Sequence, residues 1–587
     1  MILVFGGTTE GRKAVEVLEE GGSPYFYSTK TGEQDITLHH GQRIDGALDE
    51  EAMRAFCQAQ HIRLIVDAAH PFASQLHQTI AQVSEAQNIP AIRYERIYPE
   101  RDPEITWIDD YSQIPCDIHS LLATTGVQSI SKLKPLEAEG IRIYYRILQR
   151  ESSIALALKQ GASPEQLCYY EDPQDIPVEA EAILLKESGL SGGFPEKVEA
   201  AKSRGMRIIA LKRPETLAIF TIVNGPYGLR RMVEKLLPEF YPLHSGLTTG
   251  TCATAAAVAA ALRLLKKEKP EEVPVLLPDG ETIYVPVSYG EEYASVFKDA
   301  GDDPDVTNGL EIRASVNQGD RSLDSVENHG PVPLIQILGG EGVGRFTLPG
   351  FDYPPGEAAI NKAPREMIRQ NLESYGVPLQ VTISVPEGAE IARRTFNPRL
   401  GIEGGISIIG VSGIVKPFSE EAFIESIRKC MTVAKASGSE RVVINSGGKS
   451  ERFVRALYPT LPQQAFVEYG NYIGETLKIA HELNIKKVTL GVMLGKAVKL
   501  AQGHLDTHSR KATMDKDFIY TMLREAGIET DISDITLARE LWEKIPKEKT
   551  QEFVRVVINH CETFCKPLLP EGTLTTLLID DEGTIYS

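Results

Sequence analysis

The chain has 587 residues, of which 42% are hydrophobic and 24% charged, and a formal net charge of −19. This length is too great for one hydrophobic core, so we expect a globular protein with several compact units. The negative charge argues against a nucleic-acid partner, because such ligands favour a basic surface. An anionic substrate would need a local basic pocket, since the field of the whole chain repels it.

Cysteine usage and the apolar runs indicate the compartment. The seven cysteines are scattered and odd in number, which is typical of reduced thiols in a cytoplasm. Cys561 and Cys565 lack a second pair of ligands at metal-site spacing, so we predict no metal. The longest apolar run follows Thr251 and is too short to span a bilayer, and the N-terminus does not resemble a secretory signal. We expect a cytoplasmic protein without membrane contact, and the sequence is compatible with a homo-oligomer.

Two segments have the pattern with which an α/β domain begins. At the N-terminus, an apolar strand over residues 2–5 leads into a glycine-rich turn and a helix. From residue 245, a turn rich in glycine and threonine precedes a long alanine-rich helix. These two openings predict two enzymes joined end to end, in residues 1–241 and 242–587.

In the first half, strands alternate with helices, which predicts a parallel α/β sheet. We expect strands over residues 2–5, 25–28 and 64–67 and a helix from about Gly11 to Glu20. The glycine turn before this helix suits the pyrophosphate of a dinucleotide, although a plain tight turn is the alternative. The residues predicted to bind the dinucleotide here are Gly6, Gly7, Thr8, Thr9, Gly11 and Arg12.

The end of the second predicted strand bears on which dinucleotide binds. Enzymes that use NAD commonly place a carboxylate there, whereas this chain has Ser28, Thr29 and Lys30. Two hydroxyls and an ammonium suit a 2′-phosphate, so we predict NADPH. A solvated loop lysine is the alternative interpretation of Lys30.

Several further segments carry a resemblance: residues 66–73 (VDAAHPFA), 91–96 (AIRYER), 121–126 (LLATTG), 184–201 and 211–214. With them, the first half resembles the precorrin-6A reductase family of cobalamin biosynthesis. The resemblance implies a Rossmann-like reductase of two subdomains that reduces one double bond of a corrin precursor with NADPH. The implied substrate carries acetate and propionate groups. The residues expected to hold it are Arg93, Arg96, Lys186, Ser188 and Arg213.

Two single features of this half leave alternatives open. His70 either donates a proton to or orients the ring, or it caps the turn after its strand. Glu171 and Asp172 stand where the family usually has an uncharged segment, near a pocket for an anionic ring. They motivate a second interpretation, in which the first half is a catalytically weak module that binds or carries the corrinoid.

The second half is identified by long motifs in residues 248–257, 298–309, 339–368, 397–410 and 495–509. They resemble the cobalt-precorrin-5B C1-methyltransferase family of the anaerobic cobalamin pathway. The resemblance implies methyl transfer from S-adenosylmethionine to a ring carbon. The coarse pattern predicts mixed α/β structure with an initial α+β portion, which is not the common tetrapyrrole-methylase type, and a Rossmann-like subdomain at about 430–510.

The methyl donor has a candidate site in this subdomain. A strand over residues 442–445 leads into Gly447 and Gly448, and the next strand ends at Glu468. A glycine turn after one strand and an acid after the next commonly hold a nucleotide ribose. The glycine clusters at 339–344 and 401–405, with the turn at 248–251, are the alternative location.

The remaining candidates of the second half concern proton transfer and substrate binding. His504, Asp506 and His508 are spaced for proton transfer, with helix-end capping and ion pairing as the alternative. The acidic loop at 302–305 has too few ligands for a cation and is expected to be a capped turn. The residues expected to contact the substrate are Thr248, Thr249, Thr251, Arg365 and Arg399.

Together the two resemblances imply a bifunctional methyltransferase and oxidoreductase. The product of the implied methylation, cobalt-precorrin-6A, is the substrate of the implied reduction. The order of the domains is opposite to the order of the reactions. We expect two separate sites, and transfer of the ring between them within one chain is a hypothesis.

Overall fold

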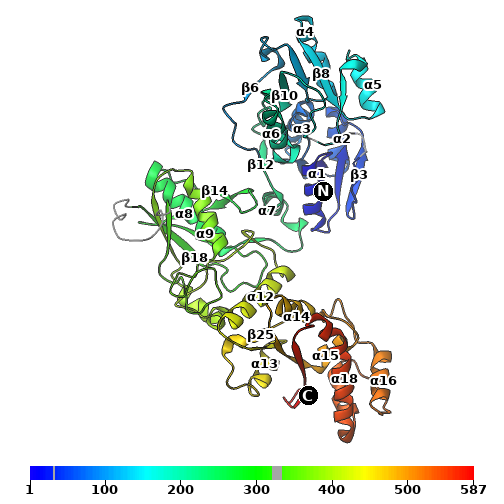
Figure 1. The fold of residues 1–587 in the computed structure, drawn as a ribbon, viewed down its shortest axis with the longest axis vertical. Coiled ribbons are helices and arrows are strands. Elements are labelled where there is room, and N and C mark those ends of the chain that lie inside the picture. Colours follow the sequence, from blue (N-terminus) through cyan, green and yellow to red (C-terminus); the bar gives the residue numbers. More distant parts are fainter. Residues whose placement is uncertain (31–33, 173, 320–333) are drawn as a thin grey trace. The chain divides into compact units, whose positions relative to one another are not determined.

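The computed structural model describes residues 1–30, 34–172, 174–319 and 334–587. The chain forms two compact units: unit 1 comprises Met1–Ser245 with Pro274–Tyr284, and unit 2 comprises Gly246–Val273 with Val285–Ser587 (Figure 1). In the described residues, no helix has the length and apolar character needed to cross a membrane.

Unit 1 begins with a sheet of six parallel strands. Their order is β12 (Phe220–Val223), β5 (Ala91–Tyr94), β4 (Leu64–Asp67), β1 (Ile2–Phe5), β2 (Tyr25–Thr29) and β3 (Gly41–Asp45). Helices α1 (Thr9–Glu19) and α7 (Pro226–Leu236) pack on one face, and α2 (Glu50–Ala59) and α3 (Ser74–Gln87) pack on the other. Coverage of both faces explains the continuous apolar runs of the inner strands.

This sheet confirms the three predicted strands and adds β3, β5 and β12. The predicted strand over residues 64–67 is β4, because β3 precedes it in the chain. β3 lies at the edge of the sheet and none of its residues is buried, so its sequence lacks the apolar run that reveals the inner strands. The first helix starts at Thr9, two residues before the predicted Gly11, because the Thr8 side chain caps it.

A second parallel sheet of six strands completes the main part of unit 1. Its order is β6 (Thr106–Ile108), β11 (Arg207–Leu211), β10 (Ala182–Lys186), β7 (Ser120–Ala123), β8 (Arg142–Ile147) and β9 (Leu167–Tyr169). Residues of α4 (Ile130–Ala138) and α5 (Glu151–Lys159) pack in one core, and residues of α6 (Phe194–Ser203) pack in another. The first half was predicted to form a parallel sheet, and the structure has two.

The segment Pro274–Tyr284 also belongs to unit 1, although it lies between parts of unit 2 in sequence. It contains the turn between β14 (Glu272–Leu276) and β15 (Thr282–Pro286). The carboxylate of Glu281 accepts hydrogen bonds from the backbone N–H groups of Tyr227 and Gly228, in the first turn of α7. Burial raises the pKa of Glu281 to about 7, against the effect of these bonds.

Unit 2 begins with an alanine-rich helix on a mixed sheet. The sheet order is β16 (Ser288–Tyr289), β17 (Ala294–Phe297), β18 (Glu311–Gln318), β21 (Leu379–Ser384) and β19 (Ile335–Gly339). Helix α8 (Thr249–Lys266) packs on β17, β18 and α9 (Lys362–Glu373), and its small side chains are almost all buried. Short elements follow: β13 (Gly246–Leu247) pairs with β23 (Ile414–Val415), β20 (Arg345–Phe346) pairs with β22 (Ile402–Glu403), and α10 (Gly388–Ile391) and α11 (Asn397–Leu400) connect them.

The last part of unit 2 is a second α/β layer structure. Four strands are parallel, in the order β25 (Phe466–Glu468), β24 (Arg441–Asn445), β26 (Lys487–Met493) and β27 (Thr573–Ile579), and β28 (Ile585–Tyr586) is antiparallel at the edge. The predicted strand over residues 442–445 is β24. The helices are α12 (Glu420–Ala436), α13 (Gly448–Arg455), α14 (Ile473–Glu482), α15 (Leu494–Ala501), α16 (Lys516–Glu525), α17 (Leu541–Lys544) and α18 (Thr550–Cys565).

Candidate active sites

A cavity of about 490 Å³ lies in unit 1, where the carboxyl ends of its strands meet. Four of the predicted residues line it: His70 after β4, Arg96 after β5, and Lys186 and Ser188 at and after the end of β10. The segment that follows β7 and the side chain of Lys197 on α6 also line it, and the sequence reasoning assigned them no role. The signal for the first was present, because LLATTG is an apolar strand end followed directly by two threonines and a glycine. We call this space the unit 1 cleft.

The unit 1 cleft is strongly positive. Burial lowers the pKa of Lys186 to about 8 and that of Lys197 to about 8, in both cases with help from neighbouring cations. The pKa of His70 is lowered to about 3, first by the loss of water around the ring and then by Arg96 and Lys186. At neutral pH, His70 is therefore uncharged, and its Nδ1 accepts a hydrogen bond from the backbone N–H of Phe72 at 3.2 Å. A bound anion would relieve this crowding of positive charge.

Arg96 joins the glycine turn to the opposite wall of the cleft. It is 8% exposed, and its Nε donates to Glu10 at 3.0 Å while Nη1 donates to the carbonyl of Ser188 at 2.7 Å. Ser191 donates a further hydrogen bond to Glu10. Although burial opposes it, these contacts hold the pKa of Glu10 below its usual value. The buried pair fixes Arg96 at the cavity wall.

Arg93 and Arg213 have carboxylate partners within the protein. Arg93 is 2% exposed and contacts Asp67 at 2.9 Å and Glu95 at 3.3 Å. Arg213 contacts Glu187 at 2.8 Å and lies over the ring of Tyr98 at 3.8 Å from its centroid. Because internal carboxylates occupy both guanidinium groups, this geometry favours roles in positioning the cleft over direct contact with a substrate.

The glycine turn after β1 has the shape of a nucleotide-binding turn. A side chain on Gly6 would lie 2.0 Å from the hydroxyl of Tyr27, so only glycine fits. Gly7 has φ +89°, and nothing lies within 4 Å of the position that a Cβ would take. Thr8 accepts a hydrogen bond from the N–H of Gly11 at 3.0 Å and donates to the carbonyl of Ala68 at 2.7 Å. Thr9 and Arg12 are exposed beside the turn on α1.

At the end of β2, some of the predicted side chains already have partners within the protein. Ser28 and Thr29 are buried, and the Thr29 hydroxyl donates to Asp45 at the end of β3 at 3.2 Å. Lys30 is exposed. The structure thus brings a carboxylate, Asp45, close to this position from the neighbouring strand, which the sequence reasoning did not identify because β3 was missed.

In unit 2, three strand ends converge. Gly447 follows β24, Glu468 ends β25, and a Cβ built on Gly447 would lie 3.3 Å from Glu468 Oε1. Lys496, on the helix that follows β26, donates to the carbonyl of Gly470. Burial lowers the pKa of Lys496 to about 8, although Glu468 opposes this, and burial also raises the pKa of Glu468. We call this place the unit 2 strand-end site.

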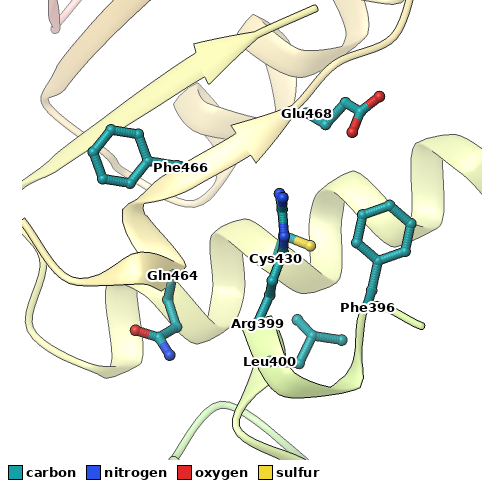
Figure 2. A pocket seen from close by; sticks show the side chains of 7 residues that line it. All are labelled: Phe396, Arg399, Leu400, Cys430, Gln464, Phe466 and Glu468. Atoms are coloured by element: carbon teal, nitrogen blue, oxygen red, sulfur yellow. The ribbon is translucent and has the colours of Figure 1, made fainter. Parts of the chain in front are cut away.

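Beside the strand-end site lies a small cavity of about 10 Å³. Figure 2 shows the Arg399 side chain reaching toward the end of β25, where Glu468 lies, between Phe396 and Phe466. Arg399 contacts Glu451 of α13 at 2.8 Å, and Glu451 also accepts from Arg455 at 2.6 Å. The structure therefore brings Gly447, Glu468 and Arg399 together, and it adds Lys496 and Glu451. The sequence signal for Lys496 was its place in the motif over residues 495–509.

The structure does not join His504, Asp506 and His508 into one constellation. Asp506 accepts from the backbone N–H of His508 at 3.0 Å and pairs with Lys511 at 2.9 Å. Nδ1 of His508 accepts from the backbone N–H of Arg510 at 3.1 Å. His504 is exposed. These contacts are those of a capped turn. Because Nδ1 of a neutral His508 is the acceptor, its Nε2 carries the hydrogen and can donate a hydrogen bond to a ligand.

The predicted threonines and Arg365 make hydrogen bonds within the protein. Thr251 donates to the carbonyl of Gly413 at 2.6 Å, and Thr249 Oγ1 accepts from the N–H of Ile409 at 2.8 Å. Thr248 caps α8. Arg365 is 6% exposed and donates to the carbonyl of Ile360 at 2.9 Å. Since these groups are engaged inside the protein, they tie the start of α8 and of α9 to neighbouring chain segments.

The acidic residues that differ from the reductase pattern stand outside the cleft walls. Glu171 and Asp172 are exposed, and their backbone N–H groups donate to Asp175 at 3.1 and 2.8 Å. In the acidic loop of unit 2, Asp305 pairs with Lys298 at 2.8 Å. Within the described ranges, no group of three or more His, Cys, Asp or Glu side chains is placed to hold a metal ion.

Two family models match this chain: Precorrin-6x reductase CbiJ/CobK over residues 1–226, and CbiD over residues 238–417. A cobalt-precorrin-5B C(1)-methyltransferase of Prosthecochloris aestuarii is 43% identical over 353 residues, which are 57% of this chain and 94% of that protein. The chain belongs to this methyltransferase family. A second member, from a Geobacillus species, is 41% identical over 54% of this chain and 88% of its own length. The matches confirm both resemblances found in the sequence.

Two solved structures are also similar in part. The cobalamin biosynthesis protein CbiD of Archaeoglobus fulgidus shares 30% identity over 49% of this chain and 85% of its own, with a TM-score of 0.26. A CobK precorrin-6A reductase shares 18% identity over 40% of this chain and 97% of its own, with a TM-score of 0.32.

Proposed function

We propose that this methyltransferase-family chain performs two consecutive steps of cobalamin biosynthesis. The second half methylates C-1 of cobalt-precorrin-5B with S-adenosylmethionine, and the first half reduces the product, cobalt-precorrin-6A, with NADPH. One observation carries the proposal. In this chain, a region that is 43% identical to a cobalt-precorrin-5B methyltransferase over nearly the whole length of that protein is joined to a segment that matches the precorrin reductase model. The product of one reaction is the substrate of the other.

For the reductase, the unit 1 cleft supplies the substrate site. Its volume of about 490 Å³ accommodates part of a flat ring, and its positive walls suit a carboxylate fringe. Arg96 and Lys186 bind carboxylates there, Ser188 adds a hydroxyl, and Lys197 adds a second ammonium. Arg93 and Arg213 hold the loops that carry these groups. His70 is uncharged and its Nδ1 is an acceptor, so it donates a hydrogen bond to the ring through Nε2–H.

The glycine turn fits a dinucleotide, because Gly7 is open to solvent at the start of α1 and Gly6 lets the turn lie close to Tyr27. In this proposal the first sheet of unit 1 is Rossmann-like, Gly6 to Arg12 hold the pyrophosphate, and Lys30 holds the 2′-phosphate. Reduced nicotinamide, when bound, supplies a hydride. The walls of the cleft orient the ring and keep water from it.

For the methyltransferase, the unit 2 strand-end site fits the nucleoside of S-adenosylmethionine. Nothing lies within 4 Å of a Cβ position on Gly448, so a ligand can approach the backbone there. Glu468 accepts hydrogen bonds from the ribose hydroxyls, and Arg399, held by Glu451, lies beside it. When bound, the sulfonium supplies a methyl group. His508, whose Nδ1 accepts from the backbone N–H of Arg510, donates a hydrogen bond to the ring system through Nε2–H, with Asp506 holding its loop.

The decisive experiment is mass spectrometry of the ring product. The purified chain is incubated with cobalt-precorrin-5B and S-adenosylmethionine, with and without NADPH. We expect a gain of one methyl group in both reactions, and of two further hydrogens only with NADPH. A product without the methyl gain would contradict the methyltransferase assignment, and a methylated product that NADPH leaves unchanged would contradict the reductase assignment.

The alternative, a carrier module in the first half, is not supported by the residues that motivated it. Glu171 and Asp172 are held in an exposed turn by Asp175 and do not line the cleft. The anionic ring therefore meets Arg96, Lys186 and Lys197 in place of these carboxylates. Steady NADPH consumption by the chain with cobalt-precorrin-6A would exclude a mere carrier.

A further inference from the structure

Lys186 holds a distinct position among the cationic groups of the unit 1 cleft. It ends β10 and lines the cavity, and its Nζ lies 5.0 Å from the centroid of the Phe72 ring. It forms no ion pair with any residue that the structure describes, and Lys132 is the charged neighbour that most influences it. An ammonium in a cavity wall, beside an aromatic ring and without a carboxylate, is available to a ligand.

The other polar groups of the cleft are less suited to release a proton. Arg96 is held by Glu10 and the Ser188 carbonyl, and a guanidinium does not deprotonate in proteins. Lys197 donates to the carbonyl of Gly192 at 2.9 Å. His70 is uncharged at neutral pH because its surroundings and the cations Arg96 and Lys186 disfavour the imidazolium.

We propose that Lys186 is the catalytic acid of the reduction in unit 1. This inference rests on the proposed reductase function and names the residue that completes its chemistry. Reduction of a conjugated double bond adds a hydride to one end, and the electron pair of the π bond moves to the other end. The atom at that end takes a proton from Lys186 Nζ, which becomes a neutral amine and regains a proton from solvent. The ring gains two hydrogens and the nicotinamide is oxidised, so atoms and electrons balance.

The electrostatic surroundings tune Lys186 for this role. Burial, assisted by Lys132 on α4, lowers its pKa to about 8, so it is mostly protonated at neutral pH yet acidic enough to donate. Groups on the other elements around it are His70 after β4, Arg96 after β5, and Lys197 on α6. Glu10 on α1 acts on His70 and is paired with Arg96 at 3.0 Å.

The test uses the full chain with Lys186→Arg, which keeps the positive charge for binding but cannot donate a proton. We expect kcat for NADPH oxidation with cobalt-precorrin-6A to fall about 100-fold or more, while KM changes little. In the unsubstituted chain, activity is expected to be high below pH 8 and to fall above it, because the protonated amine is required. This alkaline limb should be absent from the residual activity of Lys186→Arg. Lys159→Gln, on the exposed surface of α5, serves as the control and should behave as the unsubstituted chain.

A second variant and a direct titration keep the proposal testable if Lys186→Arg folds poorly. Removing the charge in Lys132→Gln should raise the pKa of Lys186 and move the alkaline limb to higher pH. NMR of ¹³Cε-labelled lysine, without substrate or cofactor, should show one resonance that titrates near pH 8, is absent in Lys186→Arg, and shifts in Lys132→Gln.

The outcomes separate the two levels of the proposal. If the unsubstituted chain does not oxidise NADPH with cobalt-precorrin-6A, the reductase function itself fails. If it does, but Lys186→Arg keeps kcat or retains the alkaline limb, only the role of Lys186 is overturned. A Lys186 resonance that titrates at the usual pH of a free lysine would also overturn it.

Discussion

Asp67 is the residue on which the buried charges beside the unit 1 cleft depend. It is fully buried at the end of β4 and accepts hydrogen bonds from Arg93 at 2.9 Å and from Ala69 N–H at 3.1 Å. Its other oxygen lies 2.6 Å from Nδ1 of His77, whose Nε2 is 3.1 Å from the carbonyl of His70. The loop that carries His70 is therefore held by this carboxylate.

We expect Asp67→Asn to lower the free energy of unfolding of unit 1 by about 3–5 kcal/mol, because it removes a buried partner of the Arg93 charge. The chain has two tryptophans, of which Trp107 lies in unit 1, so Trp107 fluorescence in a Trp542→Phe background reports urea unfolding of this unit. Asp109→Asn is the matched control, since Asp109 is mostly exposed and pairs with Lys212 at the surface. A loss below about 1 kcal/mol in Asp67→Asn would contradict the expectation.

At the unit 2 strand-end site, Glu468 is the group expected to hold the ribose. We expect Glu468→Ala to raise the Kd for S-adenosylmethionine about tenfold to 100-fold, which corresponds to the loss of hydrogen bonds to a charged acceptor. Isothermal titration calorimetry measures this without the unstable ring. Glu440→Gln is the control on the same sheet, because Glu440 is exposed and pairs with Lys487. An unchanged Kd in Glu468→Ala would move the donor site to the glycine clusters at 339–344 and 401–405.

The sequence located residues better than it located their partners. Arg96 and Lys186 were predicted as cations for the carboxylates of the implied substrate, and His70 and Glu468 from their places at or after a strand; all four lie at or just beyond strand ends, where ligands of parallel sheets bind. Thr251 was predicted to meet substrate, but its hydroxyl bonds to Gly413, 162 residues away. A contact between such distant segments leaves no local pattern, so the internal role of this threonine was not predictable.

At the scale of elements, apolar continuity decided which strands could be predicted. β1 and β4 have only buried residues, and both were predicted with the bounds that they have. β3 has no buried residue and was missed, and with it the carboxylate of Asp45 near Thr29. The assignment of Pro274–Tyr284 to unit 1 was likewise beyond the sequence, because the segment reads as an ordinary hairpin within the second half.

That hairpin gives unit 1 a pH-dependent stability. The pKa of Glu281 is raised to about 7 from the ordinary 4.5, so the folded state binds this proton more tightly than the unfolded state. Its contribution is most favourable below pH 4.5 and is lost as the pH rises through the window from 4.5 to 7. Above pH 7, we expect Glu281→Gln to be more stable than the unsubstituted chain by about 2 kcal/mol, which is less than the pKa difference alone implies because the amide accepts fewer hydrogen bonds.

Urea unfolding followed by Trp107 fluorescence at several pH values measures this difference. The advantage of Glu281→Gln should shrink as the pH falls toward 4.5. Glu272→Gln, exposed at the start of β14, is the control and should show no such trend. An advantage that grows at low pH would mean that the carboxylate stabilises α7 in its charged form.

At the scale of the whole molecule, the sign of the local charge in the unit 1 cleft is opposite to the net charge of the chain. The chain carries −19, yet the unit 1 cleft gathers Arg96, Lys186 and Lys197. This agrees with the local basic pocket that an anionic substrate requires, and it means that binding of the ring depends on short-range contacts more than on long-range attraction. The two candidate sites belong to different compact units, each with its own core, so their chemistry should be separable.

We therefore expect each site to fail alone. Lys186→Arg should convert cobalt-precorrin-5B to a methylated, unreduced ring, because the unit 2 strand-end site is intact. Glu468→Ala should reduce supplied cobalt-precorrin-6A at the unsubstituted rate but methylate slowly at low donor concentration. An equimolar mixture of the two variants, with saturating cofactors, should restore the full two-step conversion, since ring released by one chain can enter the cleft of the other. Mass spectrometry of the ring over time distinguishes the unmethylated, the methylated, and the methylated and reduced ring. If either substitution abolished both steps while both chains remained folded, the two units would share one site, and the division of chemistry between them would be wrong.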